Sequence, residues 1–232
     1  MFSIIHDSDL HFGRNGNLKA RDDKESNRQV IIDNDSDSDF VIVTGDLTEN
    51  GYDGKQLLCY NYGGFSKQLQ MLKEDYVNPL ESEGISVKLC IGNHDRGRPP
   101  YLYQPVFNYV KERHGEIEYS FDHKGFRFIC CGKYPKRLEW LEEQLQENVP
   151  TIIFFHYNLE GEWSDFWKED EKAFFSDVIN GYNIVAILVG HHHISDITNW
   201  KDYTVISSAG KGYTQIILDP SDGTIYKVIF KN

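Results

Sequence analysis

Short apolar segments that stop at polar residues are the feature that most restricts how this chain folds. Such segments recur along the 232 residues, are rich in Val, Ile and Phe, and are bounded by turn residues. This pattern is typical of buried β-strands. We therefore expect strands at residues 2–5, 40–45, 87–92, 126–132, 151–156, 184–190, 203–210, 214–218 and 225–230.

Helical spacing of apolar residues appears between several of these strands. The last two strands flank the sequence DPSDG, which is a hairpin signal. Strands that alternate with helices and end in a hairpin predict an α/β fold with mixed sheets. The three helical stripes are Leu69, Leu72 and Tyr76; Leu138, Leu141 and Leu145; and Phe174, Phe175, Val178 and Ile179.

Length and charge limit the number of domains and the kinds of partner. A chain of 232 residues predicts a single domain over 1–232, and 14% aromatic residues argue against disorder. The net charge of −12 disfavours an extended nucleic-acid surface. A small phosphorylated substrate remains compatible with that charge, because bound divalent metals would reverse the local field.

Cysteine spacing and the N-terminal sequence predict the compartment. Cys59, Cys90, Cys130 and Cys131 match no zinc or CxxC spacing, so we expect buried, reduced thiols. The N-terminal sequence MFSIIHDSDLHFG has no basic region before an apolar run. No stretch approaches the roughly 18 apolar residues of a membrane span. We expect a soluble cytoplasmic protein, and the oligomeric state stays open.

Five of the predicted strands lead into Asp, Asn or His. In open α/β sheets, ligands bind beyond the carboxyl ends of the strands, so these side chains are expected at one edge. They are Asp7, Asp9 and His11 after the first strand; Asp46 after the second; Asn93, His94 and Asp95 after the third; His156 after the strand at 151–156; and His191, His192 and His193 after the strand at 184–190.

Each of these residues also has an ordinary structural explanation. Asp46 could cap a helix, Asn93 could occupy a turn, and His156 could be a hydrogen-bonded core histidine. A shared site explains all of them at once, whereas separate roles require five coincidences.

The ligand types favour a metal centre. Carboxylate and amide oxygens with imidazole nitrogens, without thiolate, suit Mn²⁺, Fe²⁺ or Zn²⁺. Residues two apart share one face of an extended chain, so His191 and His193 are expected to face one centre and His192 to face away. Asp9 and His11 are paired in the same way.

The order of these blocks resembles the calcineurin-like metallophosphoesterase family, whose signature runs D-x-H, G-D, G-N-H-[DE], H and G-H-x-H. This chain has DLH at 9–11, GDL at 45–47, GNHD at 92–95, a histidine at 156 and GHHH at 190–193. The resemblance spans most of the chain. It implies an α/β/β/α sandwich of two mixed β-sheets flanked by helices.

The resemblance also implies roles for single residues at a site with two divalent ions. Manganese is the favoured metal, with Fe, Zn, Ni or Co as alternatives. His94 and Asp95 form the expected catalytic pair, in which His94 protonates the leaving oxygen or contacts phosphate and Asp95 orients ligands. Asp7 could also orient ligands, or compete with Asp9 as one. The implied ligands are Asp9, His11 and His193 for the first ion, Asn93, His156 and His191 for the second, and Asp46 as the bridge.

The implied activity is phosphoester hydrolysis, in which a hydroxide bridging the two ions attacks phosphorus. The sequence GDLTENG lacks the arginine of the GDxxDRG form of protein Ser/Thr phosphatases and resembles the form of members similar to cyclic-nucleotide phosphodiesterases. We expect a phosphodiesterase for a small, nucleotide-like substrate. Phosphomonoesterase and nuclease activities are alternatives, as is a non-catalytic metal-binding interaction module.

Two further expectations concern the substrate pocket. Arg96 and Arg98 could bind phosphate, although an exposed loop position explains them equally well. Tyrosine-rich loops at 52–63 and 97–118 are expected to shape the pocket.

Overall fold

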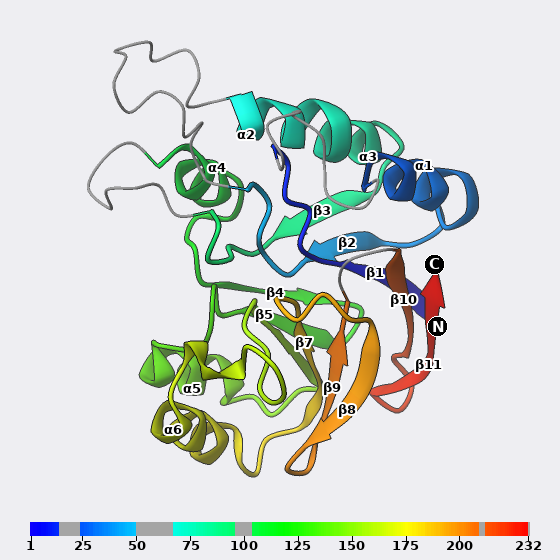
Figure 1. Cartoon of the computed structure of the whole chain (residues 1–232). Helices are drawn as coiled ribbons and strands as arrows, with labels where there is room; N and C mark the ends of the chain where they lie inside the picture. The colour runs from blue at the N-terminus through cyan, green and yellow to red at the C-terminus, as the bar shows by residue number, and fades with distance from the viewer. Residues whose placement is uncertain (14–23, 50–66, 96–103, 209–211, 232) are drawn as a thin grey trace, which may run out of the picture.

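Two β-sheets pack face to face, and helices cover the outer face of each sheet (Figure 1). The computed structural model describes residues 1–13, 24–49, 67–95, 104–208 and 212–231. The predicted α/β/β/α arrangement of two mixed sheets is confirmed.

The first sheet has the strand order β11-β10-β1-β2-β3. Its strands β1, β2 and β3 are parallel, so their carboxyl ends lie at the same edge. β10 and β11 form the predicted antiparallel hairpin at the other side. The strands are β1 (Phe2–Asp7), β2 (Phe40–Val43), β3 (Ser86–Leu89), β10 (Tyr213–Asp219) and β11 (Thr224–Lys231).

The second sheet has the strand order β4-β5-β6-β7-β9-β8. Its central strands β5, β6, β7 and β9 are parallel, and β4 and β8 pair antiparallel at the two edges. The strands are β4 (Tyr119–His123), β5 (Phe126–Cys130), β6 (Thr151–Phe154), β7 (Ile184–Val189), β8 (Asp196–Trp200) and β9 (Tyr203–Ser207).

Helices complete the two outer layers. Those between β1 and β4 cover the first sheet, and α5 and α6 cover the second (Figure 1). Among the helices of the described residues, none has the length and apolar character that crossing a membrane requires. The helical elements are α1 (Lys24–Asn34), α2 (Lys67–Met71), the π-helical η4 (Leu72–Val77), α3 (Asn78–Ser82), α4 (Pro105–His114), α5 (Leu138–Leu145), the 3₁₀ turn η5 (Ser164–Phe166) and α6 (Glu169–Ile179).

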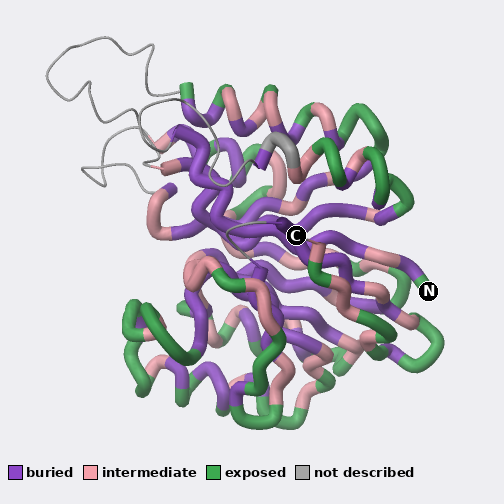
Figure 2. The backbone as a smooth tube through the Cα atoms, turned by 45° about the vertical axis from the view of Figure 1, so that its right-hand side comes forward, coloured by how far each residue is buried: buried purple, intermediate pink, exposed green. Residues whose placement is uncertain are grey.

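The central core lies between the sheets. Ile4 and Ile42 of the first sheet pack in one cluster with Phe128, Phe154 and Leu188 of the second, and all five are fully buried. Buried strands cross the middle of the molecule, and exposed positions lie on the outer turns of the helices (Figure 2). The apolar runs in the interior of the sheets form buried strands because both of their faces are covered, whereas β11 at a sheet edge exposes Tyr226 and Phe230.

The structure corrects several expectations. Residues 105–114, expected within a loop, form α4, and its Tyr109 is buried in the core. Strands β4 and β8 and helix α1 were not expected. Phe174 is 60% exposed, so the buried stripe of α6 runs through Phe175 and Ile179 instead. Residues 52–63 and 97–103 lie outside the described residues.

The cysteine prediction is confirmed where the structure describes it. Cys90, Cys130 and Cys131 are buried free thiols. The Sγ atom of Cys90 lies 2.9 Å from the carbonyl oxygen of Gly132, to which it donates. Cys59 lies outside the described residues.

Candidate metal centre

Four loops after parallel strands are bound to one another at the edge of the sandwich. The loops after β1 and β2 continue side by side: Asp9 N donates to the Gly45 carbonyl at 3.0 Å, and His11 N donates to the Asp46 carbonyl at 2.9 Å. The loop after β7 joins them, because His191 N donates to Asp9 Oδ2 at 3.0 Å. The loop after β3 joins through His94 N, which donates to Asp46 Oδ1 at 2.8 Å.

Two glycines make this close approach possible. A Cβ atom on Gly92 would lie 2.1 Å from Asp46 Oδ1, and one on Gly190 would lie 1.9 Å from Ser8 Oγ. No real Cβ contact is that short, so any other residue at either position would push the loops apart. The glycines in GNHD and GHHH are therefore required by packing around the ligands.

Five of the predicted ligands have left-handed backbone. This conformation is uncommon for residues other than glycine and costs about 1–3 kcal/mol at each position. Such strain is found where the surrounding structure and a function require it. The five residues and their φ angles are Asp9 (54°), His11 (48°), Asp46 (49°), His191 (69°) and His193 (58°).

The first group of predicted ligands surrounds Asp9. Asp9 Oδ1 lies 3.0 Å from His193 Nε2 and 3.7 Å from His11 Nε2. Asp9 is fully buried and His11 almost so. Within the described residues, neither Asp9 Oδ1 nor His11 Nε2 makes a hydrogen bond. A buried carboxylate oxygen and imidazole nitrogen in that state fit a cation held between them.

The second group surrounds His156. Its Nε2 atom lies 2.9 Å from Asn93 Oδ1 and 3.2 Å from His191 Nδ1. His156 Nδ1 donates to the Thr44 carbonyl at 2.8 Å, because a carbonyl oxygen can only accept. The lone pair of the neutral ring is therefore on Nε2, which faces the other two ligand atoms. That is the orientation expected of a metal-binding histidine.

Asp46 lies between the two groups. Its Oδ1 atom is 3.3 Å from His156 Nε2, and its Oδ2 atom is 3.5 Å from His11 Nε2. The two oxygens of one buried carboxylate thus face different groups. This geometry is what a bridging ligand requires.

Burial and charge set the titration of these side chains. Burial lowers the pKa of His11, but the carboxylates of Asp9, Glu49 and Asp46 outweigh it and raise the pKa to about 9. Burial also opposes protonation of His156, and its contacts with Asp46 and the Thr44 carbonyl again raise the pKa to about 9. These carboxylates favour positive charge in this space, and a bound metal would have to displace the ring protons.

His191 and Asp46 titrate in the opposite direction. Burial and the neighbouring His156 lower the pKa of His191 to about 4. Burial would raise the pKa of Asp46, but His156 lowers it to about 2. Asp46 is ionised and His191 neutral at neutral pH, which are the protonation states that bind metal.

The donor set therefore fits a divalent transition metal. The residues offer carboxylate and amide oxygens and imidazole nitrogens, and no thiolate contributes. Candidate ligand atoms of Asp9, His11 and His193 lie within 4.8 Å of one another, and so do those of Asp46, His156 and His191. The structure brings together all seven predicted ligands, and their metal-binding roles remain predictions.

Asp95, which was expected to orient ligands, binds the backbone of the two loops that carry Asp46 and Asn93. Asp95 accepts hydrogen bonds from Gly92 N at 2.8 Å, Leu47 N at 3.1 Å and Thr48 N at 2.8 Å. It joins the GDL loop to the GNHD loop and is a positioning residue rather than one that would touch substrate. Burial and the nearby Asp46 raise its pKa.

Asp7 does not compete with Asp9. Its carboxylate forms a buried ion pair with Lys24 and accepts a hydrogen bond from Tyr76 Oη at 2.7 Å. These partners come from α1 and η4, on the far side of the first sheet from the second sheet. The predicted substrate residues Arg96 and Arg98 lie outside the described residues.

Sequence reasoning missed Glu49. Its Oε2 atom lies 2.8 Å from His11 Nδ1, and its carbonyl oxygen accepts a hydrogen bond from His94 Nδ1 at 2.7 Å. His94 Nε2 then faces Asp46 Oδ2 at 3.9 Å, and the side chain is 37% exposed. The signal was present as the glutamate of GDLTENG, three residues after Asp46.

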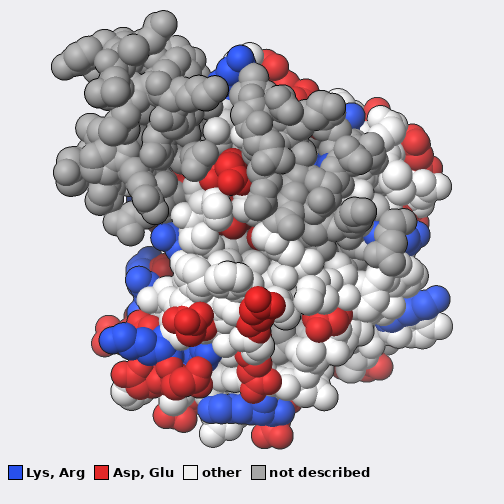
Figure 3. All heavy atoms as spheres, viewed as in Figure 1, with Lys and Arg blue, Asp and Glu red and all other residues white. Residues whose placement is uncertain are grey.

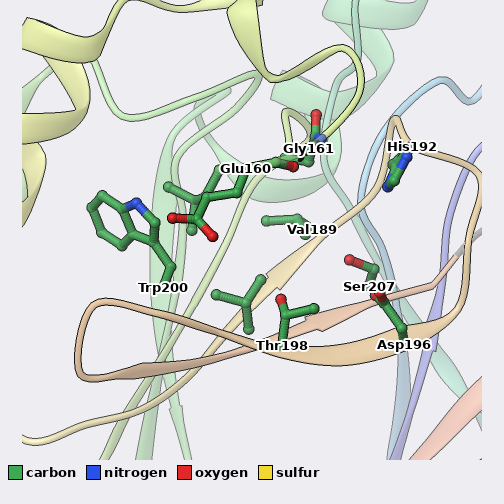
Figure 4. Close-up of a pocket in the computed structure, with 11 residues that line it drawn as sticks. Glu160, Gly161, Val189, His192, Asp196, Thr198, Trp200 and Ser207 are labelled. Atoms are coloured by element: carbon green, nitrogen blue, oxygen red, sulfur yellow. Dashed lines mark hydrogen bonds between the residues drawn. The ribbon is translucent and has the colours of Figure 1, made fainter.

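His192 faces away from the ligands, as predicted, although His191 and His193 have left-handed rather than extended backbone. It lines a cavity of about 270 Å³ on the outer side of the second sheet, together with Glu160, Asp196 and Trp200. In Figure 4, His192 lies at one side of this cavity and the indole of Trp200 at the other, with Val189 between them. This cavity contains none of the predicted ligands and is separate from the metal centre.

Comparison with known proteins identifies the class. Residues 2–195 match the calcineurin-like phosphoesterase family, and the chain belongs to this family. A relative from Rhodococcus erythropolis, described as a probable cyclic nucleotide phosphodiesterase, is 23% identical over 231 residues. The alignment covers 91% of this chain and 71% of the relative.

Solved structures share the fold at low identity. A purple acid phosphatase from yellow lupin (Lupinus luteus) superposes with a TM-score of 0.65 at 14% identity, over 99% of this chain. This chain covers 53% of that phosphatase, so it spans about half its length. GAP50, described as the anchor in the inner membrane complex of Plasmodium, superposes with a TM-score of 0.60 at 11% identity, over 100% of this chain and 88% of its own.

The family membership and the assembled donor groups together define the chain as a metal-dependent phosphoesterase, a hydrolase of phosphoric ester bonds. The predicted family and reaction class are confirmed.

Proposed function

We propose that this phosphoesterase holds two divalent ions, one on each side of Asp46, and hydrolyses a small, nucleotide-like phosphodiester. The proposal rests on the orientation of the Asp46 carboxylate. One of its oxygens faces His11 Nε2 at 3.5 Å, and the other faces His156 Nε2 at 3.3 Å. Two bound ions would neutralise the phosphoryl oxygens and lower the pKa of a coordinated water.

His94 supplies the proton for the leaving oxygen. Its Nδ1 atom is held by the Glu49 carbonyl, so Nε2 is the atom that can approach a substrate. The ring is partly exposed to solvent, and its centroid is 4.7 Å from that of His11. An imidazole fixed at one nitrogen and free at the other is suited to general acid catalysis.

Charge supports a small substrate. The chain carries a net charge of −12, and on the face shown in Figure 3 acidic and basic side chains are interspersed around α5 and α6. An extended nucleic acid needs a continuous basic surface, whereas a single phosphodiester needs only the charge of the site. The Rhodococcus relative, described as a probable cyclic nucleotide phosphodiesterase, supports the same substrate class.

A non-catalytic interaction module is the competing class, and the description of GAP50 as an anchor gives it a precedent within the fold. That class predicts missing ligands. Here every ligand position of the signature is filled, and the side chains are assembled. Catalysis is therefore the function that the site supports best.

The test is hydrolysis of bis-p-nitrophenyl phosphate and p-nitrophenyl phosphate by Mn²⁺-loaded protein. We expect faster turnover of the diester, and loss of turnover in Asp46→Asn by about 100-fold or more, because one oxygen of the bridge becomes a neutral amide. Preference for the monoester would assign a phosphomonoesterase. No metal-dependent turnover of either ester would favour the non-catalytic module.

A further inference from the structure

An exposed aromatic surface adjoins the candidate metal centre. The loop after β6 carries Tyr157, Trp163 and Phe166, and the ring of Phe166 lies 4.6 Å from the ring of His191, edge to face. Tyr157 lies 4.9 Å from the same imidazole and 5.4 Å from Phe166. Trp163 extends the surface, with its ring 6.4 Å from that of Phe166.

The outer two rings are open to solvent although burial would stabilise them. Trp163 is 55% exposed and Phe166 is 46% exposed, whereas Tyr157 beneath them is buried. Burying such a side chain contributes about 1.5–3 kcal/mol, so two adjacent exposed aromatics leave a considerable stabilisation unused. Contiguous exposed apolar surface of this kind is typical of a binding site.

The loop holds these rings in place. Asn158 Nδ2 donates to the carbonyl oxygens of Glu160 at 2.7 Å and Glu162 at 2.9 Å. The buried indole of Trp167 donates to the Asn158 carbonyl at 3.1 Å. Trp163 itself has left-handed backbone with φ of 66°, which is uncommon for a bulky residue. The loop therefore holds Trp163 in a strained backbone conformation in which its indole is exposed.

The position of the surface indicates what it binds. Phe166 contacts His191, so a phosphoester at the centre would have its ester group within reach of the rings. Glu160, Glu162 and Asp165 are exposed on the same loop, which disfavours a group that carries further phosphate. Neutral planar groups bind aromatic side chains by stacking.

We propose that Trp163 and Phe166 form a stacking subsite for the nucleobase of the substrate. The inference rests on the proposed function for its location, and it adds the recognition of a neutral, planar heteroaromatic group. Neither residue is a predicted metal ligand, so the subsite contributes to substrate choice rather than to the chemical step.

Calorimetry on Mn²⁺-loaded protein tests the subsite with AMP and with ribose 5-phosphate, which has a hydroxyl group in place of the base. We expect AMP to bind about 5- to 10-fold more tightly, the lower range of base–aromatic stacking. Trp163→Ala and Phe166→Leu should lose this preference. The leucine keeps an apolar contact with His191, and Phe174→Ala removes an aromatic of similar exposure from α6 as the matched control.

Equal binding of the two ligands by the wild-type protein would overturn the subsite, as would a preference that survives in both variants or the absence of AMP binding. Hydrolysis of bis-p-nitrophenyl phosphate by the same preparations is measured in parallel. If the wild-type protein does not hydrolyse this ester, the proposed function is refuted. The calorimetric comparison remains valid in that case, so the two failures are distinguishable.

Discussion

Glu49 Oε2 lies 2.8 Å from His11 Nδ1, while Nε2 of the same ring faces Asp9 and Asp46. A carboxylate behind a metal-binding histidine fixes the ring orientation and raises the basicity of the ligand atom. Glu49 therefore contacts the side of the His11 ring that is opposite to Asp9 and Asp46.

Removal of this carboxylate should weaken metal binding. For Glu49→Ala we expect about 10- to 100-fold lower Mn²⁺ affinity, the usual effect of losing such a partner. Glu49→Gln should lose less, because its amide oxygen can take the position of the carboxylate oxygen beside His11 Nδ1. Titration of metal-free protein with Mn²⁺ measures the effect. Glu142→Ala, at an exposed position of α5, is the control, and equal affinities in all variants would refute the role.

Substitution of Gly92 should disrupt the centre sterically. The Cβ of Gly92→Ala would lie 2.1 Å from Asp46 Oδ1 and 2.3 Å from Asp46 N, and overpacking of this kind costs about 1–3 kcal/mol. We expect a lower melting temperature together with loss of bound metal.

Gly84→Ala is the matched control for that substitution. Its Cβ would meet nothing within 4 Å, although the φ of 83° adds backbone strain. It should lower the melting temperature and keep the full metal content. A Gly92→Ala protein that also keeps its metal would show that the loops can separate without harm to the site.

His94→Ala should reduce turnover more strongly for substrates with a poorer leaving group. General acid catalysis contributes about 10²- to 10⁴-fold, and a nitrophenolate leaves without needing a proton. We therefore expect a large loss with alkyl phosphodiesters and a small one with bis-p-nitrophenyl phosphate, with metal content unchanged. Comparable losses on both substrates would contradict the role as proton donor.

His6 should make the stability of the metal-free protein depend on pH. Burial and the positive charge of Lys24 lower the pKa of His6 to about 3. The folded protein keeps this ring neutral, whereas the unfolded chain takes up a proton below about pH 6.5. Stability from His6 is thus present above pH 6.5 and is lost as the pH falls toward 3.

Chemical denaturation measures this effect. Between pH 6.5 and 5, His6 should account for about 2 kcal/mol of lost unfolding free energy. His6→Gln, which can still hydrogen-bond Thr44, should lack that part of the pH dependence. If the unfolding free energies of the wild-type and His6→Gln proteins change with pH in the same way, His6 does not titrate as expected.

The candidate ligands could be found from the sequence because they lie within the few residues that follow an apolar run, and parallel strands bring such positions together. Spacing alone could not separate Asp7 from Asp9, because both share a face of the strand. What separates them is Lys24 and Tyr76, which occupy Asp7 and come from distant helices. The contact of Glu49 with His11 is equally non-local.

The missed elements have local causes. β8, with the sequence DITNW, exposes Ile197 and its neighbours at a sheet edge, so it has no apolar run. Helix α1 lies on the surface, and its Ile31 is buried while Val30 is exposed. Three strands end earlier than predicted: at 43 instead of 45, at 89 instead of 92 and at 189 instead of 190. The glycine at each predicted end already belongs to the loop that holds Asp46, Asn93 or His191.

Anomalous diffraction at the manganese edge, from crystals grown with Mn²⁺, tests most directly whether Asp46 bridges two ions. We expect two anomalous peaks about 3.5–4 Å apart, with one oxygen of Asp46 directed at each. One peak is expected near Asp9, His11 and His193, and the other near Asn93, His156 and His191. A single peak, or two peaks without Asp46 between them, would contradict the bridging role.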